Sequence, residues 1–339
     1  MSTNSTKHSV LLIVIGSLAF FSANRLCQAQ DIYVTNASGR TVTAYNAATG
    51  ASGFTITGLF NPEEMATWGN EIYFTDGDFI RAYNASTGAS TFNVMESSYA
   101  IASVAAINNE LYVAGSGSLN EYNGTTGAAG FSVSSGIDGP EGIAVSSNDV
   151  FVANGGNSTV TAYNTTTGSL DFTISNGVNV PYALLVSGTD LFVEDGGNNT
   201  VTEYNTANGS PGFTISTGVT EPSALAVAGN DLFVANYGNN TITEYNASTG
   251  QSGFTISTGV NEPQALAVLG NELYLANSSN SVVEYNATTG AEGFTFTTGI
   301  NEPIAIVASP VPEPSAYLLT TVAFGLVGVW RRRGSPARS

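Results

Sequence analysis

Residues 224–256 read ALAVAGNDLFVANYGNNTITEYNASTGQSGFTI. They contain four short runs rich in branched and aromatic residues, at 224–227, 231–236, 241–246 and 253–256, as expected of β-strands. Gly and Asn between the runs supply the positive φ angles and the side-chain caps that tight turns require. The stretch therefore predicts one antiparallel sheet of four strands.

The same pattern recurs seven times. Its most regular marker is a tyrosine followed by asparagine in the third run, at intervals of 38 to 41 residues. These tyrosines are Tyr45, Tyr83, Tyr122, Tyr163, Tyr204, Tyr245 and Tyr285. A period near 40 residues made of short strands is typical of a β-propeller with one sheet, or blade, per repeat. We therefore predict an all-β, seven-bladed β-propeller over residues 30–309.

The two ends of this array are complementary. It starts directly on a second run at residues 31–34 and ends on a first run at residues 304–307. Pairing of that C-terminal strand with the N-terminal blade would complete the first sheet and remove an open edge. We therefore predict a ring closed by its last strand.

Residues 1–29 read as a secretory signal peptide. Lys7 and His8 give a weakly positive N-terminal region, and residues 10–21 form an apolar run. Small residues lie at the expected cleavage point near Ala29. Cys27 leaves a lipoprotein anchor as an alternative, although bulky residues precede it where that motif requires small ones.

Residues 310–339 read as a C-terminal sorting signal. A Pro-Glu-Pro motif at 312–314 precedes an apolar stretch at 316–330 and an arginine cluster at 331–333. As a helix the apolar stretch would rise about 22 Å, less than a usual membrane span, although snorkelling arginines can extend it. Positive residues stay cytoplasmic, which would place the repeats outside. A plain membrane anchor is the alternative interpretation.

This order of elements resembles the PEP-CTERM sorting signal of bacterial secreted proteins. The resemblance implies an exosortase as processing partner, transient anchoring in the inner membrane, and delivery to the cell surface or extracellular matrix. It assigns the recognition motif and the stop-transfer cluster by match, to Pro312, Glu313 and Pro314 and to Arg331, Arg332 and Arg333.

The repeats also resemble known propeller families. DIYVTN at 31–36 and VANYGNNT at 234–241 are similar to the YVTN repeats of bacterial surface-layer propellers. PEGIAV at 140–145 is similar to NHL and SMP-30-like propellers. The SMP-30 resemblance implies an alternative function, a divalent-metal-dependent lactonase or hydrolase.

The charge is strongly asymmetric. Residues 30–314 hold all 26 acidic residues and two basic ones, Arg40 and Arg81, a difference of −24. Such a body repels nucleic acids and anionic membranes and attracts cations. The only His and the only Cys lie in the leader, so side chains that most often act as base or nucleophile are missing from the repeats. We therefore expect that the protein does not bind nucleic acids and that it is not an enzyme.

In a propeller, the loops entering each blade and the turns between its second and third runs share one face. Acidic candidates for this face are Glu221, Glu262, Glu302, Glu141, Asp76 and Asp195. Carboxylate and amide oxygens are ligands suited to Ca²⁺, so these residues predict a calcium site. Solvated carboxylates that cap turns are the alternative.

Together these features predict a non-catalytic cell-surface or extracellular-matrix protein that binds polysaccharide, protein or cations. The metal-dependent lactonase is the second hypothesis, with catalytic candidates among Glu141, Glu221, Glu262 and Glu302. A structural array without a ligand is the third.

Overall fold

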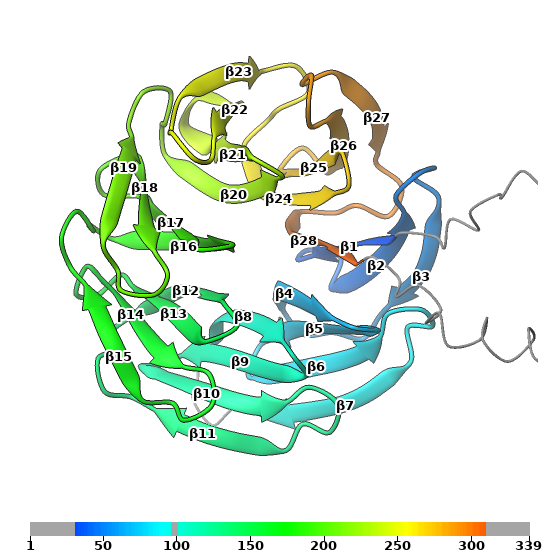
Figure 1. The fold of residues 1–339 in the computed structure, drawn as a ribbon. Coiled ribbons are helices and arrows are strands. Elements are labelled where there is room, and N and C mark those ends of the chain that lie inside the picture. The colour runs from blue at the N-terminus through cyan, green and yellow to red at the C-terminus, as the bar shows by residue number, and fades with distance from the viewer. Residues whose placement is uncertain (1–30, 96–100, 310–339) are drawn as a thin grey trace, which may run out of the picture.

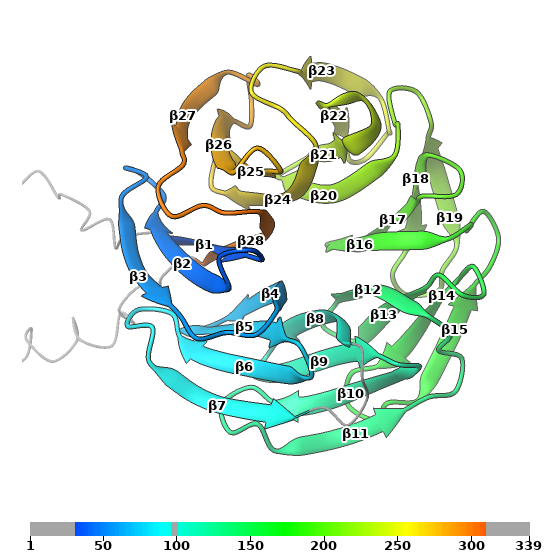
Figure 2. The ribbon, with the colours of Figure 1, turned by 180° about the vertical axis from the view of Figure 1, so that it is seen from behind.

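The fold is a ring of seven four-stranded antiparallel sheets (Figures 1 and 2). It is seen in a computed structural model that describes residues 31–95 and 101–309. The predicted seven-bladed propeller is confirmed. The predicted leader and sorting tail lie outside the described residues.

The strands of each blade follow one another from the channel outward. Blade 1 has β28 (Pro303–Ser309), β1 (Asp31–Asn36), β2 (Thr41–Asn46) and β3 (Ser52–Ile56). Blade 2 has β4 (Pro62–Trp68), β5 (Glu71–Asp76), β6 (Phe79–Asn84) and β7 (Ser90–Met95). Blade 3 has β8 (Ile101–Ile107), β9 (Glu110–Gly115), β10 (Ser118–Asn123) and β11 (Ala129–Val133). Blade 4 has β12 (Pro140–Val145), β13 (Asp149–Asn154), β14 (Thr159–Asn164) and β15 (Leu170–Ile174).

The remaining blades repeat this arrangement. Blade 5 has β16 (Pro181–Ser187), β17 (Asp190–Asp195), β18 (Thr200–Asn205) and β19 (Pro211–Ile215). Blade 6 has β20 (Pro222–Ala228), β21 (Asp231–Asn236), β22 (Thr241–Asn246) and β23 (Ser252–Ile256), with a short 3-10 turn at Tyr237–Asn239. Blade 7 has β24 (Pro263–Leu269), β25 (Glu272–Asn277), β26 (Ser281–Asn286) and β27 (Glu292–Phe296).

The C-terminal strand closes the ring as predicted. β28 pairs antiparallel with β1, and Ile306 lies opposite Val34 in the register. Figure 1 shows the orange β28 beside the blue β1. The first blade is therefore built from both ends of the described chain.

The core lies between blades. The buried apolar residues form seven clusters, and each combines side chains from two neighbouring blades. Tyr33 from β1 and Ile72 from β5, for example, share one cluster. Each sheet therefore buries its two faces against its neighbours.

The recurrent tyrosines hold adjacent blades together. The Tyr245 hydroxyl in blade 6 donates to the main-chain carbonyl of Thr217, in the loop that leaves blade 5, over 2.7 Å. Tyr285 donates likewise to Thr258, in the loop leaving blade 6. Their rings are fully buried. A tyrosine at this position supplies both the apolar surface and the polar end that a buried interface needs.

The innermost strands begin earlier than the apolar runs suggested. Six of the seven start at a proline, as in β20, which begins at Pro222 rather than Ala224. Proline fits the first residue of a strand because it has no N–H to donate to the ladder. In blade 6 the register with the next strand then shifts between Pro222 and Ala224, which leaves Ser223 as the extra residue. Such a bulge turns its side chain out of the regular alternation.

No helix in the described part of the chain is long and apolar enough to cross a membrane.

Candidate functional site

One face of the ring is formed by the loops that enter each blade and by the turns after its second strand; we call it the loop face. The two sets of loops are tied together in the structure. The Asn236 side chain at the end of β21 accepts the main-chain N–H of Thr220 over 2.9 Å. Asn277 does the same for Asn261 over 3.0 Å. The shared face expected from the sequence is therefore present.

Three candidate calcium ligands occupy equivalent places on this face. Glu221, Glu262 and Glu302 have positive φ angles of 44°, 45° and 54°. The main-chain N–H of each donates to an asparagine side chain of the preceding blade, as Glu221 does to Asn199 over 2.6 Å. Their side chains are exposed. The backbone at these positions joins neighbouring blades, and the carboxylates face solvent.

Asp76 and Asp195 lie deeper, at the ends of β5 and β17, and both are fully buried. Asp76 accepts the N–H groups of Phe60 (2.6 Å) and Asn61 (2.7 Å), and its other oxygen binds Arg81 Nε at 2.6 Å. Asp195 accepts the N–H of Asn179 at 3.1 Å, while its Oδ2 has no hydrogen-bond partner. Both carboxylates thus cap the loop that enters their own blade.

These acidic side chains do not come together as a metal centre. Within residues 31–95 and 101–309, no three His, Cys, Asp or Glu side chains are grouped so as to hold a metal ion. Glu221, Glu262 and Glu302 sit on three successive loops around the ring. The calcium site therefore stays a prediction.

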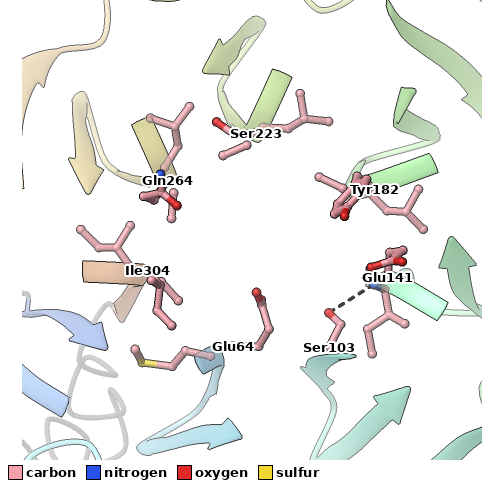
Figure 3. A pocket seen from close by; sticks show the side chains of 18 of the residues that line it. Glu64, Ser103, Glu141, Tyr182, Ser223, Gln264 and Ile304 are labelled. Atoms are coloured by element: carbon pink, nitrogen blue, oxygen red, sulfur yellow. Dashed lines mark hydrogen bonds between the residues drawn. The ribbon is translucent and has the colours of Figure 1, made fainter. Parts of the chain in front are cut away.

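The channel at the centre of the ring encloses a cavity of about 330 Å³. All seven innermost strands line it (Figure 3). The polar side chains among its lining residues are Glu64, Ser103, Glu141, Tyr182, Ser223 and Gln264. All except Ser103 lie at the register shifts of β4, β12, β16, β20 and β24. The bulges therefore direct functional groups toward the lumen.

The two channel carboxyls have raised pKa values. The Glu64 carboxyl faces the lumen but is surrounded by the inner strands, and this enclosure, with the nearby Glu63 carboxylate, raises its pKa to about 7. Burial also raises the pKa of Glu141. The lumen therefore favours neutral carboxyls or a cation beside them.

Close packing fixes the wall between Glu141 and Tyr182. A Cβ atom added at Gly142 would lie 2.3 Å from the main-chain oxygen of Tyr182. Because a backbone atom cannot move aside cheaply, β12 and β16 approach each other here only with glycine. Glu141 and Tyr182 are thereby held on neighbouring strands at the channel wall.

Blade 5 differs from its neighbours, although the repeats look nearly equal in sequence. Glu194 stands where four other blades have alanine; it is 1% exposed, its Oε2 has no partner, and burial raises its pKa to about 8. Val180 in the same blade's entry loop has a φ of 52°, an unusual value for a β-branched residue. Comparing DLFVED at 190–195 with DLFVAN at 231–236 would have revealed this exception.

Sequence reasoning also missed the exposed aromatic residues of the loop face. Phe60, Tyr182 and Tyr237 are 70%, 53% and 40% exposed. Phe60 packs near Gly77, Tyr182 near Gly196, and the N–H of Tyr237 donates to Glu221. All three therefore lie where entry loops meet second-strand turns. Their signal in the sequence was weak because aromatic residues are frequent throughout the repeats.

The fold is shared with solved propellers of low sequence identity. The crystal structure of the computationally designed Ika8 protein has a TM-score of 0.64 at 16% identity, covering 81% of this chain and 86% of that one. The crystal structure of BamB from Moraxella catarrhalis has a TM-score of 0.56 at 14% identity, covering 78% and 84%. Identities this low show the fold alone.

No curated protein matches the chain in sequence. A family model does match, in two overlapping stretches at residues 115–222 and 213–335, which together span about two thirds of the chain. The chain therefore belongs to the family whose model is described as outer membrane protein assembly factor BamB.

Proposed function

We propose that this protein is a non-catalytic binding propeller of the cell exterior that docks a partner protein on its loop face. The observation that carries the proposal is the set of exposed aromatic side chains on that face, Phe60, Tyr182 and Tyr237, of which Tyr182 also lines the channel. Aromatic residues surrounded by a polar rim are the anchors expected of a protein interface.

The charge favours a protein over an anionic polysaccharide. Exposed Glu221, Glu262 and Glu302 add negative charge to the loop face. A face of this sign steers basic protein segments and repels acidic polymers. Membership in a family described as an outer membrane protein assembly factor agrees with a protein partner at the cell envelope.

Docking should depend on the exposed aromatics. The double variant Phe60→Ser/Tyr237→Ser is expected to lose at least tenfold in affinity for the partner, about 1.4 kcal/mol, because two apolar anchors are removed. The measurement immobilises the 31–309 propeller and compares retention of the producer's surface proteins with retention of its deproteinised exopolysaccharide.

The matched control is Leu170→Ser/Met95→Ser, which removes two exposed apolar side chains from outer strands. Equal loss in both variants, or retention of the polysaccharide alone, contradicts protein docking on this face. Turnover of lactones with added Ca²⁺, Mn²⁺ or Zn²⁺ that disappears in Glu141→Gln would establish the lactonase instead.

We also propose export through the leader and processing of the tail by an exosortase. Replacing Pro312 and Pro314 by alanine is expected to leave the tail uncleaved and the protein in the inner membrane. Intact mass and cell fractionation measure both effects. A wild-type protein that keeps residues 310–339 at the cell surface would show a plain anchor instead.

A further inference from the structure

The channel cavity contains three side chains that the fold itself does not use. Its other polar groups are engaged. The Ser223 hydroxyl donates to the carbonyl of Pro263 over 2.7 Å. Gln264 Nε2 donates to the carbonyl of Glu262 (3.0 Å) and to Ser278 (2.9 Å). The Ser103 hydroxyl accepts the N–H of Ile143 at 3.3 Å (dashed line in Figure 3).

Glu64, Glu141 and Tyr182 remain available. Among the described residues, none of their side chains makes a hydrogen bond or ion pair. Figure 3 shows the Glu64 side chain extending into the cavity, with Glu141 and Tyr182 next to each other across it. Gly142 packs under the Tyr182 carbonyl and fixes their two strands. The free groups therefore share one lumen and have defined positions.

The described chain supplies no cation to these carboxyls. Between residues 30 and 314 only Arg40 and Arg81 are basic. Arg81 is bound to Asp76, and the Arg40 guanidinium lies 5.9 Å from the centre of the Phe60 ring. A positive group that reaches the lumen must therefore come from outside the described residues.

The chemistry fits an organic cation better than a metal ion. Ca²⁺ takes six to eight oxygen ligands, and no three acidic side chains of the described residues are grouped for a metal. An alkylammonium needs one or two carboxylates and is further stabilised by an aromatic face. Glu64, Glu141 and Tyr182 provide these two kinds of contact.

Resting on the proposed docking function, we propose that the channel binds the ammonium group of a lysine side chain of the partner protein. The cavity of about 330 Å³ accommodates such a side chain. Glu64 and Glu141 accept its hydrogen bonds, and the ring of Tyr182 packs along the chain and the charge. Phe60 and Tyr237 outside the cavity then contact the surrounding segment of the partner.

The pH dependence of binding follows from the Glu64 carboxyl. Enclosure and Glu63 raise its pKa to about 7, and Glu141 is raised in the same direction by burial. Glu63 itself accepts from the Asn61 side chain, and neither Arg40 nor Arg81 reaches the lumen. Because only the ionised carboxylate pairs with ammonium, affinity should increase as the pH rises from 6 to 8.

The test uses two acetylated, amidated tripeptides, Gly-Lys-Gly and its acetyl-lysine counterpart, which has nearly the same shape without the charge. Each is titrated into the purified protein at pH 8 and at pH 6, and binding is followed by calorimetry. The peptide with a free lysine side chain is expected to bind at least tenfold more tightly than the acetyl-lysine peptide. Glu64→Gln is expected to weaken binding of the lysine peptide at least tenfold and to reduce its pH dependence, of which only the contribution of Glu141 then remains.

Glu221→Gln is the matched control because it removes one negative charge from the exposed loop face. Equal weakening by Glu221→Gln and Glu64→Gln would show diffuse electrostatic attraction and overturn the proposal, as would equal binding of the two peptides. Displacement of the lysine peptide by equimolar Ca²⁺ would make the channel a metal site instead.

This inference and the docking function fail separately. A lysine peptide held in the channel while no partner is retained on the loop face contradicts docking alone. A partner whose retention needs Phe60 and Tyr237 but is unchanged by Glu64→Gln contradicts the channel site alone.

Discussion

Ending the chain after Asn301 is expected to abolish cooperative folding, whereas ending it after Ser309 leaves the propeller intact. The shorter chain loses β28, which pairs with β1 over six register positions and places Ile306 in the interface with blade 7. Six ladder positions at about 1 kcal/mol each, and one buried isoleucine at about 2 kcal/mol, amount to most of a domain's usual stability of 5–15 kcal/mol. The edge of β1 would also be exposed to pairing with other chains.

The comparison is well matched because both truncations remove residues 310–339. Urea unfolding of the two chains, followed by tyrosine fluorescence and by circular dichroism, measures the effect. The longer chain should unfold in one sharp transition. A shorter chain with the same midpoint and slope would mean that the ring does not need its closing strand.

The fold was readable from the sequence because each blade repeats a residue with a fixed physical role. Tyr245 must bury its ring between blades and also reach a main-chain carbonyl of the preceding blade, so tyrosine recurs at this place. Turn glycines such as Gly250, with a φ of 69°, recur because other residues adopt that conformation at a cost. The ring closure was likewise predictable, since the array begins and ends on complementary strands.

The channel could not be read in the same way. Its lining residues occupy bulges, where the alternation of side chains breaks and a residue count no longer tells which way a side chain points. In β4 the shift spans both Glu63 and Glu64, and it is Glu64 that lines the lumen. Counted from the proline that begins each strand, Glu141, Tyr182, Ser223 and Gln264 match Glu63, whereas Glu64 matches Gly142, Ala183, Ala224 and Ala265, so no repeated residue type marked the lumen.

The sequence identified the acidic candidate residues, but it did not predict which groups surround each carboxylate in the fold. Asp76 and Asp195 look alike as the last residues of second strands. Only the structure shows that Arg81, five residues after Asp76, turns back to pair with it. The residue at the register position of Arg81 in blade 5 is Thr202, which pairs with Val193 as Arg81 pairs with Phe74, and it carries no charge that could pair with the free oxygen of Asp195.

Asp195→Asn is expected to stabilise the protein at pH 8 by about 3 kcal/mol and to change little at pH 4. Asparagine is the residue at this place in blades 1, 4, 6 and 7. In blade 6 the Asn236 Nδ2 donates to the carbonyl of Val234 at 3.2 Å, and in blade 4 Asn154 donates to Val152 at 3.2 Å. Asp195 places an acceptor oxygen where those blades have a donor.

The sign of the pH effect follows from the pKa. Burial raises the pKa of Asp195 to about 7, against about 3.9 for an unfolded aspartate. The folded protein therefore binds this proton more tightly, and its stabilising contribution is complete below pH 4 and lost as the pH rises through 7. Three pH units at about 1.4 kcal/mol each set an upper limit near 4 kcal/mol. Asparagine cannot ionise, so the variant should escape this loss.

Thermal unfolding at pH 4, 6 and 8 measures the difference between variant and wild type. Distant carboxyls with raised pKa, such as Asp149 beside Asp171 and Glu284 beside Glu272, are present in both proteins and cancel in the difference. The neighbouring Glu194 adds to the effect, because the Asp195 carboxylate contributes to its raised pKa and the substitution removes that contribution. At pH 8 the melting temperature should rise by about 5 °C or more.

The control is Asp76→Asn, the same chemical change at the equivalent position of blade 2. There the carboxylate has a partner, and its loss leaves Arg81 without its ion pair, so Asp76→Asn should lower stability at pH 8. A gain of equal size at pH 4 and pH 8 in Asp195→Asn would show that the benefit comes from packing rather than from the missing proton. No gain at pH 8 would mean that Asp195 Oδ2 has an effective partner when ionised, and the blade-to-blade comparison would be wrong at this position.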